Sequence, residues 1–307
     1  MSNFEEYIAH ELNGLPQSIP NSAEKYIRNI HDKAGIYYRV FARTKSVHST
    51  INKMKKKSYG ADKKMQDLLG VRVVLYFKDD IDICIKMLKA ELELIDESID
   101  DEEEDRFSPT RLNMVFNMPE QIIQLFSKTI WELPIDKTFE IQVRTIFSEG
   151  WHEVEHDLRY KNKDDWEKVP KLSRSLNGIF ATLDTCDWAI LHVFDELAYV
   201  KYKNDEWECM LRNHWRIHMI DDTLTDEICE IFNRDKNVAK AFYRVPRENV
   251  ITCISNTNTS KVPKKMTNII YLVNLEFVKN EDIRRLTPSA LINIVRQQDD
   301  DFVKSRQ

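Results

Sequence analysis

The order of apolar and polar residues predicts alternating helices and strands in the first part of the chain. Over residues 21–42, apolar and aromatic side chains recur every three or four positions, as expected for an amphipathic helix. A basic helix is predicted at 46–57, and an apolar, β-branched strand follows at 68–77 (LLGVRVVLYF). An amphipathic helix at 79–95 and then an acidic loop are expected next.

Two more strands are predicted at 111–118 (RLNMVFNM) and 137–144 (KTFEIQVR). A short helix at 119–129 separates them, and a long helical stretch follows at 146–203, with a break expected near 163–171. Strands separated by helices indicate the α/β (α+β) class, with a mixed β-sheet flanked by helices.

The strand at 137–144 has the cleanest pattern in the chain, because polar and apolar side chains alternate along it. Successive side chains of a strand point to opposite faces of the sheet. One face therefore carries apolar residues and the other carries polar ones, namely Phe139, Ile141 and Val143 against Glu140, Gln142 and Arg144. Such a polar face belongs either to solvent or to a functional site, because burying it without partners is costly.

The pattern changes near residues 203–210, and we expect two domains, 1–203 and 204–307. The second domain is predicted to be a small α+β domain. Its elements are a helix at 222–233, short strands within 243–254, a strand at 269–278 (IIYLVNLEFV) and a last helix from Thr287.

Composition narrows the classes of function. The 307 residues include only six glycines, and neither G-x-G-x-x-G nor a G-x-x-x-x-G-K-[ST] loop occurs. A bound nucleotide would therefore need side chains, rather than a glycine-rich loop, to hold its phosphates. No apolar run approaches the length of a membrane span, and the N-terminus does not resemble a signal peptide. The five cysteines are far apart, so we expect a cytoplasmic protein with reduced thiols and no membrane partner.

The net charge of −6 conceals two segregated runs. Residues 91–105 include ten acidic side chains, whereas residues 43–64 include eight lysines and arginines against one acidic residue. Within the basic run, Lys45, Ser49 and Lys53 recur every four positions, which predicts one face of a helix. Two ammonium groups beside a hydroxyl suit a polyphosphate, although a solvated basic helix has the same pattern.

Two other charged groups lie at the apolar strand 68–77. Asp67 precedes the strand, where a carboxylate can hold a metal ion, and Arg72 lies within it and needs a partner. The alternative is a turn residue and a salt-bridged arginine. Two zinc-like patterns are also present, H-E-x-x-H at 152–156 and C-x4-H-x3-H at 209–218, but both lack further ligands.

Together, three motifs resemble the synthetase domain of RelA/SpoT-type alarmone synthetases over about residues 20–200. The segment 140–161 (EIQVRTIFSEGWHEVEHDLRYK) is similar to the family's E-[IV]-Q-[IV]-R-T strand and the helix after it. Arg43 to Lys53 fits R-x-K-x3-S-x3-K, and Asp67 to Arg72 fits D-x-x-G-x-R. The resemblance implies a nucleotidyltransferase-like fold and places the H-E-x-x-H residues within the family's helix. About twenty residues precede it, too few for the family's hydrolase domain.

The resemblance implies an ATP-dependent pyrophosphokinase that acts on the ribose 3′-hydroxyl of GDP or GTP. It implies that Arg43 and Arg72 sandwich adenine, and that Lys45, Ser49 and Lys53 hold the ATP phosphates. Asp67 and Glu140 would be the catalytic carboxylates and would hold Mg²⁺, and Glu140 would also accept the hydroxyl proton. The acceptor side would comprise Gln142, Arg144, Glu155, His156, Phe107 and Asn113.

One departure from the family leaves the acceptor open. The family's Y-x-S-x-H element aligns with a segment in which Pro109 replaces the base-stacking tyrosine and Asn113 replaces the histidine. Phe107, two positions before Pro109, is a candidate for stacking on the base from a shifted position. Three hypotheses follow: synthesis of (p)ppGpp or an adenine analogue, a toxin or defence enzyme that modifies the 3′-terminal adenosine of tRNA, or a non-catalytic sensor. Residues 204–307 are expected to restrain the synthetase or to bind an antitoxin or regulatory partner.

Overall fold

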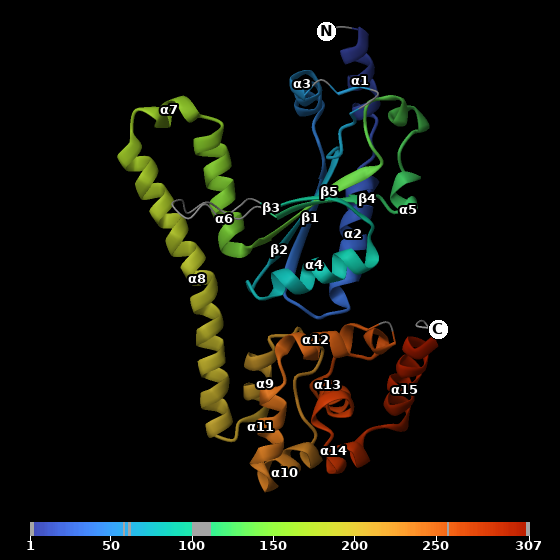
Figure 1. The fold of residues 1–307 in the computed structure, drawn as a ribbon, viewed down its shortest axis with the longest axis vertical. Coiled ribbons are helices and arrows are strands. Elements are labelled where there is room, and N and C mark those ends of the chain that lie inside the picture. Colours follow the sequence, from blue (N-terminus) through green and yellow to red (C-terminus); the bar gives the residue numbers. More distant parts are fainter. Residues whose placement is uncertain (1–2, 58, 61–62, 100–111, 257, 305–307) are drawn as a thin grey trace. The chain divides into compact units, whose positions relative to one another are not determined.

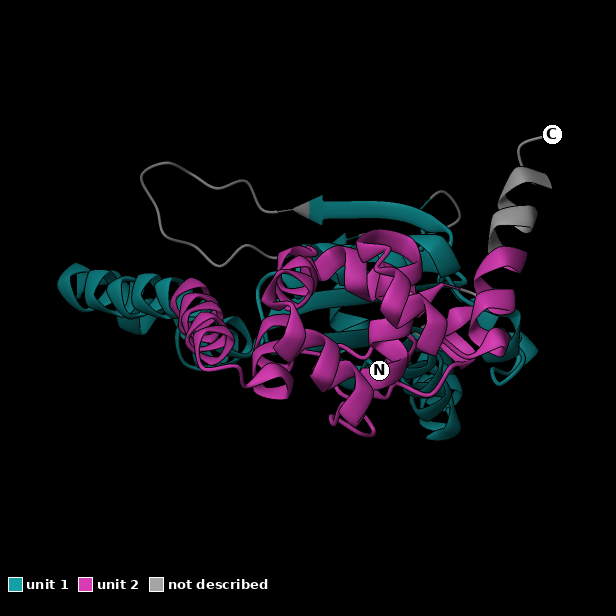
Figure 2. Cartoon of the chain, turned by 90° about the horizontal axis from the view of Figure 1, so that it is seen from below, with its two compact units in different colours: residues 1–30, 38–187 teal, residues 31–37, 188–307 magenta. Residues whose placement is uncertain are grey.

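A computed structural model describes residues 3–57, 59–60, 63–99, 112–256 and 258–304. Phe107 and most of the acidic run after residue 99 lie outside these ranges. The chain divides into two compact units, residues 1–30 with 38–187 and residues 31–37 with 188–307 (Figure 2). This division falls within one long helix, α8 (Pro170–Lys203), whereas the expected domain boundary lies at the end of that helix. None of the described helices is long and apolar enough to cross a membrane.

A five-stranded sheet in the order β1-β2-β5-β4-β3 organises the first unit (Figure 1). Its strands are β1 (Tyr38–Thr44), β2 (Leu69–Leu75), β3 (Leu94–Ile99), β4 (Leu112–Asn117) and β5 (Thr138–Thr145). The strands β2 and β5 pair in parallel, and the other neighbouring pairs are antiparallel. The prediction of a mixed sheet flanked by helices is therefore confirmed.

Helices surround this sheet and connect its strands (Figure 1). The connecting segments between the strands contain α3, α4, α5 and η1, and α6, η2, α7 and α8 follow the last strand. The bounds are α1 (Asn3–Asn13), α2 (Ser18–Asp32), α3 (Val47–Lys57), α4 (Asp80–Glu91), α5 (Glu120–Ile123), η1 (Lys128–Glu132), α6 (Ile146–Val154), η2 (Glu155–Tyr160) and α7 (Lys163–Glu167).

The sheet has one apolar and one polar face, as the alternation along β5 predicts. Phe139 and Ile141 on β5 are fully buried, together with Val73 on β2 and Met114 on β4. Buried apolar side chains of α2 and α4 complete this core, and α4 contacts β5. The opposite face of β2 and β5 carries Gly70 and Glu140 as direct neighbours, with Arg72 and Gln142 as the next pair. The core thus fixes the direction in which the polar side chains point.

Two strands of this sheet differ from the sequence prediction. Residues 38–44 form β1 rather than the end of a helix, since α2 ends at Asp32 and the chain turns at Gly35. Aromatic and β-branched residues in 38–44 favour a strand, although their spacing also fits a helix. Residues 94–99 form the edge strand β3 within the expected acidic loop. Charged side chains are usual on edge strands, because they discourage pairing with other chains.

The described part of the second unit is helical. It contains α9 (Trp207–Trp215), α10 (Asp226–Arg234), α11 (Lys236–Arg244), α12 (Arg247–Ser255), η3 (Thr259–Lys261), α13 (Met266–Val273), η4 (Asn274–Val278), α14 (Glu281–Leu286) and α15 (Ser289–Lys304). The predicted strands within 243–254 and at 269–278 are therefore wrong, and so is the α+β prediction for this part of the chain. Residues 269–273 are buried on every side of α13, so they lack the helical periodicity that identifies an amphipathic helix.

The second unit depends on the turn at Gly35. This residue has a φ of +66°, and its carbonyl oxygen accepts a 2.7 Å hydrogen bond from the backbone N–H of His218. A Cβ atom there would lie 2.8 Å from Cγ2 of Ile217.

We therefore expect Gly35→Ala to destabilise the protein by roughly 1–3 kcal/mol, because alanine is strained at positive φ and overlaps its neighbour. Gly178→Ala is the matched control, because it lies in α8 and, outside the helix's own backbone, the described residues place no atom within 4 Å of its added Cβ. That change is expected to stabilise by about 0.5–1 kcal/mol. Urea denaturation measures the unfolding free energy of both variants. Equal stability of the two variants contradicts this account of Gly35.

Candidate functional site

The carboxylate of Asp67 lies between two lysines at the start of β2. Lys45 Nζ donates to Asp67 Oδ2 at 2.7 Å, and Lys53 Nζ donates to the same oxygen at 2.5 Å. Burial alone would raise the pKa of Asp67, but hydrogen bonds and charge from the two lysines outweigh it and keep this pKa below its usual range. The carboxylate is therefore ionised at neutral pH, and its negative charge holds both ammonium groups in place.

The sequence predicted that Lys45 and Lys53 share a helix face with Ser49, and the structure arranges them differently. Lys45 precedes α3 and is anchored by a 2.7 Å bond from its backbone N–H to the carbonyl oxygen of Leu68. Ser49 and Lys53 lie one turn apart on α3, and the exposed hydroxyl of Ser49 accepts a 2.9 Å bond from Ser46 Oγ. The two lysines still converge, because they meet at Asp67.

A row of residues across three strands connects this corner to the polar face. Arg43 on β1 pairs with Gly70 on β2, and Gly70 pairs with Glu140 on β5. Among the described residues other than its chain neighbours, one atom lies within 4 Å of the position that a Cβ of Gly70 would take, namely the carbonyl oxygen of Arg43 at 4.0 Å. The glycine therefore leaves open space on this face between an exposed arginine and a half-buried carboxylate.

Arg72 is held by two acidic side chains of α6. Glu149 and Glu153 both accept hydrogen bonds from its Nη1 atom. Burial lowers the pKa of Arg72, yet the two carboxylates outweigh burial and raise it above its usual value. The hydrogen bond from Arg72 is also the main reason why the pKa of Glu153 is lowered. The arginine is thus a fixed cation whose position depends on the helix after β5.

The polar side chains of β5 are joined to this arginine through one network. Gln142 Nε2 donates to Glu140 Oε1 at 2.5 Å, and Arg144 Nη2 donates to Gln142 Oε1 at 3.1 Å. Arg144 Nη1 also donates to Glu149 Oε2 at 3.1 Å, so Glu149 links the arginines of β2 and β5. Because each side chain is held by its neighbour, the orientation of Glu140 is fixed through Gln142.

The remaining described residues predicted for the acceptor side are Asn113, Glu155 and His156. Of these three, Asn113 is the one next to the β5 network. Asn113 is the β4 partner of Gln142, and its buried Oδ1 atom has no hydrogen-bond partner among the described residues. Glu155 and His156 lie in the π-helical turn η2, where Glu155 pairs with Arg159 at 3.4 Å and His156 contacts Asp157 at 2.9 Å. No described contact joins these last two to the β5 network.

Magnesium fits the carboxylates of this site better than zinc fits the histidine patterns. Asp67 Oδ1 is buried without a hydrogen-bond partner, and Glu140 lies on the same side of the sheet as the open space at Gly70. Mg²⁺ takes oxygen ligands, commonly one or two carboxylates with phosphate oxygens. By contrast, the described residues contain no group of three histidine, cysteine or acidic side chains placed to hold a metal ion.

Glu149 and Glu153 are the residues that sequence reasoning missed. Their four-residue spacing on a helix directly after the polar strand was visible, and this spacing puts both carboxylates on one face. That they meet Arg72, far away in sequence, follows only from the parallel pairing of β2 with β5.

The ion pairs of Asp67 predict a specific pH dependence of stability. Because the native pKa of Asp67 lies below its unfolded value near 3.8, its stabilisation is present above pH 3.8 and is lost as pH falls through the native pKa. Asp67→Asn should therefore be less stable than the wild type at pH 7, and the difference should shrink below pH 3.8. Urea denaturation at pH 7 and pH 3 measures this difference in stability, and Asp165→Asn, at an exposed position, is the control. A difference that is absent at pH 7, or that persists undiminished at pH 3, contradicts the expectation.

Comparisons with known proteins agree with the motifs. Residues 42–165 match the family model described as "Region found in RelA / SpoT proteins". No curated protein matches the chain. Among solved structures, similarity is found to small alarmone synthetase 1 of Bacillus subtilis, with 23% identity, a TM-score of 0.46, and coverage of 63% of this chain and 96% of that chain.

Two further structures are similar at the same level. A GTP pyrophosphokinase family protein of Streptococcus pneumoniae has 20% identity and a TM-score of 0.49, covering 64% of this chain and 95% of that chain. The B. subtilis synthetase 1 bound to its product pppGpp has 23% identity and a TM-score of 0.47, covering 64% of this chain and all of that chain. The part of the chain that matches the model of a region found in RelA/SpoT proteins contains β2, β3, β4, β5 and α6.

Proposed function

We propose that the protein is an ATP-dependent pyrophosphokinase that transfers the β,γ-pyrophosphate of ATP to a ribose 3′-hydroxyl, with GDP or GTP as acceptor and a (p)ppGpp-type product. One observation carries the proposal. The polar face of the sheet brings Arg43, Arg72 and Glu140 together from three strands, next to an Asp67 carboxylate that holds two lysines. Cations for a polyphosphate and carboxylates for magnesium thus occur in one place.

ATP binding is assigned to the arginines and to the corner at Asp67. Arg43 is exposed, and among the described residues Arg72 donates hydrogen bonds only from Nη1, so flat guanidinium faces are available for stacking on adenine. Lys45, Ser49 and Lys53 are assigned to the phosphates. Both lysines pair with the single carboxylate of Asp67, which leaves one net positive charge on the three groups, and phosphates would supply negative charge to the same ammonium groups.

The transfer step is assigned to Glu140. Its carboxylate accepts the proton of the 3′-hydroxyl while that oxygen bonds to the β-phosphorus, and the bond from the β-phosphorus to the α-phosphate oxygen breaks. ATP and the acceptor thus give AMP and the acceptor 3′-diphosphate. Asp67 and Glu140 are the residues that would hold Mg²⁺, which supplies charge neutralisation on the phosphates when bound. Gln142 fixes Glu140 in position, since it donates to Oε1.

A second candidate function has the tRNA 3′ end as acceptor. The end of α3 carries Lys55, Lys56 and Lys57, all exposed, and RNA phosphates attract such basic side chains. The third candidate is a non-catalytic sensor. In that case the second unit would bind an antitoxin or another regulatory partner. Cytoplasmic location is proposed together with these functions, because their substrates are cytoplasmic.

The acceptor assay separates these functions. We expect label from [β-³²P]ATP to appear in a guanine nucleotide when the protein is incubated with GDP, GTP or deacylated tRNA and Mg²⁺. Glu140→Gln should reduce transfer by at least about a hundredfold, since general base catalysis contributes 10²–10⁴-fold. Label in tRNA alone supports the toxin function instead. No transfer to any acceptor, with cellular effects that Glu140→Gln leaves unchanged, supports the sensor.

The open space at Gly70 gives an independent prediction about ATP. Gly70→Val should fold normally, because its Cβ meets only the Arg43 carbonyl oxygen at 4.0 Å. Its methyl groups would nevertheless occupy the space between Arg43 and Glu140, so we expect ATP affinity to fall at least about tenfold. Gly150→Val is a control on α6, where the described residues beyond the helix's own backbone place no atom within 4 Å of the added Cβ. A thermal melt measures the folding of the two variants, and isothermal titration measures their affinity for ATP. Normal ATP affinity of Gly70→Val contradicts the assignment.

A further inference from the structure

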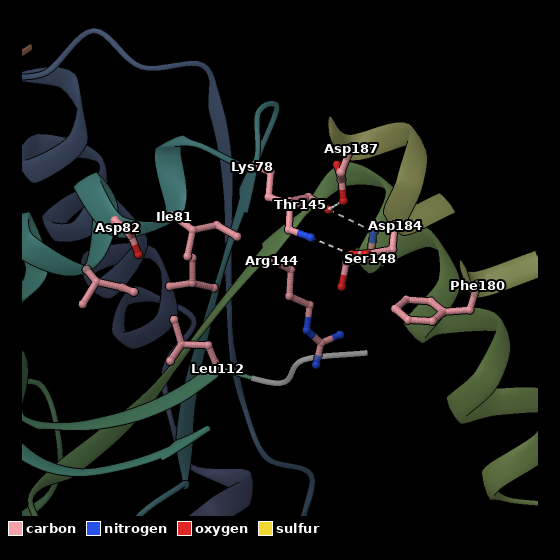
Figure 3. A pocket seen from close by; sticks show the side chains of 12 residues that line it. Lys78, Ile81, Asp82, Leu112, Arg144, Thr145, Ser148, Phe180, Asp184 and Asp187 are labelled. Atoms are coloured by element: carbon pink, nitrogen blue, oxygen red, sulfur yellow. Dashed lines mark hydrogen bonds and ion pairs between the residues drawn. The ribbon is translucent and has the colours of Figure 1, made fainter. Parts of the chain in front are cut away.

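A cavity at the end of β5 is not used by the ATP assignment. It has a volume of about 220 Å³ and lies within the first unit, where β5 meets α4 and α8. Figure 3 labels side chains of α4 on one side and of α8 on the other, namely Ile81, Asp82, Phe180, Asp184 and Asp187. Leu112 and Val143 also line it, and they belong to the apolar face of the sheet. The sheet therefore separates this cavity from Glu140 on the polar face.

Asp187 is the unusual residue of the cavity. It is 3% exposed, and its Oδ2 atom accepts a 2.6 Å hydrogen bond from Thr145 Oγ1 (Figure 3). Its Oδ1 atom is buried without a hydrogen-bond partner among the described residues. Thr145 is itself fixed, because its hydroxyl oxygen accepts a 3.1 Å bond from the backbone N–H of Ser148 at the start of α6. A ligand that donates to Oδ1 would thus satisfy a costly buried group that is already held in place.

The charges around the cavity leave Asp187 without an ion pair of its own among the described residues. Lys78 Nζ pairs with Asp184 Oδ1 at 2.7 Å. Arg144 pairs with Glu149 at 3.1 Å. Burial raises the pKa of Asp187 and the charge of Asp184 raises it further, while a hydrogen bond and the charge of Lys78 only partly offset these effects. An ammonium group beside this carboxylate would supply the missing positive charge, whereas an anion would be repelled.

The remaining walls suit a small apolar body. Apolar side chains line the cavity from α4, the sheet and α8, namely Ile81, Ile85, Leu112, Val143 and Phe180. An apolar cavity of about 150 Å³ is large enough to bind benzene. A volume of about 220 Å³ therefore has room for one ring together with a short arm that carries an ammonium group.

We propose that this cavity is a binding site for a small primary amine, whose ammonium group pairs with Asp187 and whose apolar body fills the space between α4 and α8. The inference does not depend on the transferase function proposed above. A metal ion suits the site less well, since the described residues contain no group of three histidine, cysteine or acidic side chains placed to hold one. A nucleotide suits it less well too, because complete ligands of that kind occupy about 300–1,000 Å³ and its phosphates would meet a carboxylate.

Three probes of the same size test the proposal on the full chain. Isothermal titration compares benzylamine, which is a cation, with neutral benzyl alcohol and anionic benzoate. We expect one benzylamine to bind per chain with a dissociation constant of about 1 mM or lower, an ordinary affinity for a ligand of this size. Benzyl alcohol should bind at least about tenfold more weakly, and benzoate more weakly still. A wild type that binds benzyl alcohol or benzoate as tightly as benzylamine, or that binds none of the three, overturns the proposal.

Two matched variants locate the contact. Asp187→Asn keeps the shape of the side chain and an oxygen for Thr145, so it should fold, and a thermal melt measures this. It should weaken benzylamine by about tenfold or more and leave benzyl alcohol within about twofold. Asp82→Asn removes the same charge from the exposed opposite wall, and it should leave benzylamine within about twofold. Unchanged benzylamine affinity in Asp187→Asn, or equal weakening by the two variants, overturns the assignment of the ammonium group to Asp187.

Discussion

The alternation of side chains along β5 is the constraint on which the rest of the first unit depends. This strand lies between β2 and β4, so its apolar side chains must enter the core. Burying Phe139 and Ile141 leaves Glu140, Gln142 and Arg144 no direction but the opposite face. A one-residue shift in register would move all of them to the wrong side and expose the core residues. The stability of the sheet and the placement of the site therefore have the same cause.

Ion pairs and hydrogen bonds between neighbouring side chains hold the site in place. Asp67 holds two lysines together, and Glu149 joins two arginines that would otherwise repel each other. Partly buried charges are tolerable because each has an opposite charge or a hydrogen bond near it. The Oδ1 atom of Asp67 is an exception, because it is buried without a hydrogen-bond partner among the described residues. In the proposed function a metal ion would satisfy this oxygen.

The sequence predicted those features that depend on local pattern. The faces of β5, the buried strand β2 and the helix α3 follow from spacing alone, whereas β1 was assigned to a helix because aromatic residues fit both periods. The buried helix α13 was assigned to a strand, since full burial removes the amphipathic pattern. Contacts such as Arg72 with Glu149 and Thr145 with Asp187 depend on pairing between distant segments. Local pattern contains no information about such pairs, so these parts of the site required the structure.

The central claim is that the polar face of the sheet transfers pyrophosphate, and the adenine product of ATP tests it most directly. Transfer of the β,γ-pyrophosphate leaves AMP, whereas hydrolysis or transfer of the γ-phosphate leaves ADP. Chromatographic measurement of AMP and ADP, in the presence of Mg²⁺ and GDP, should find AMP formed in equal amount to a 3′-modified nucleotide. Glu140→Gln should form neither. ADP as the main product, or AMP that forms without a modified acceptor, would contradict the account.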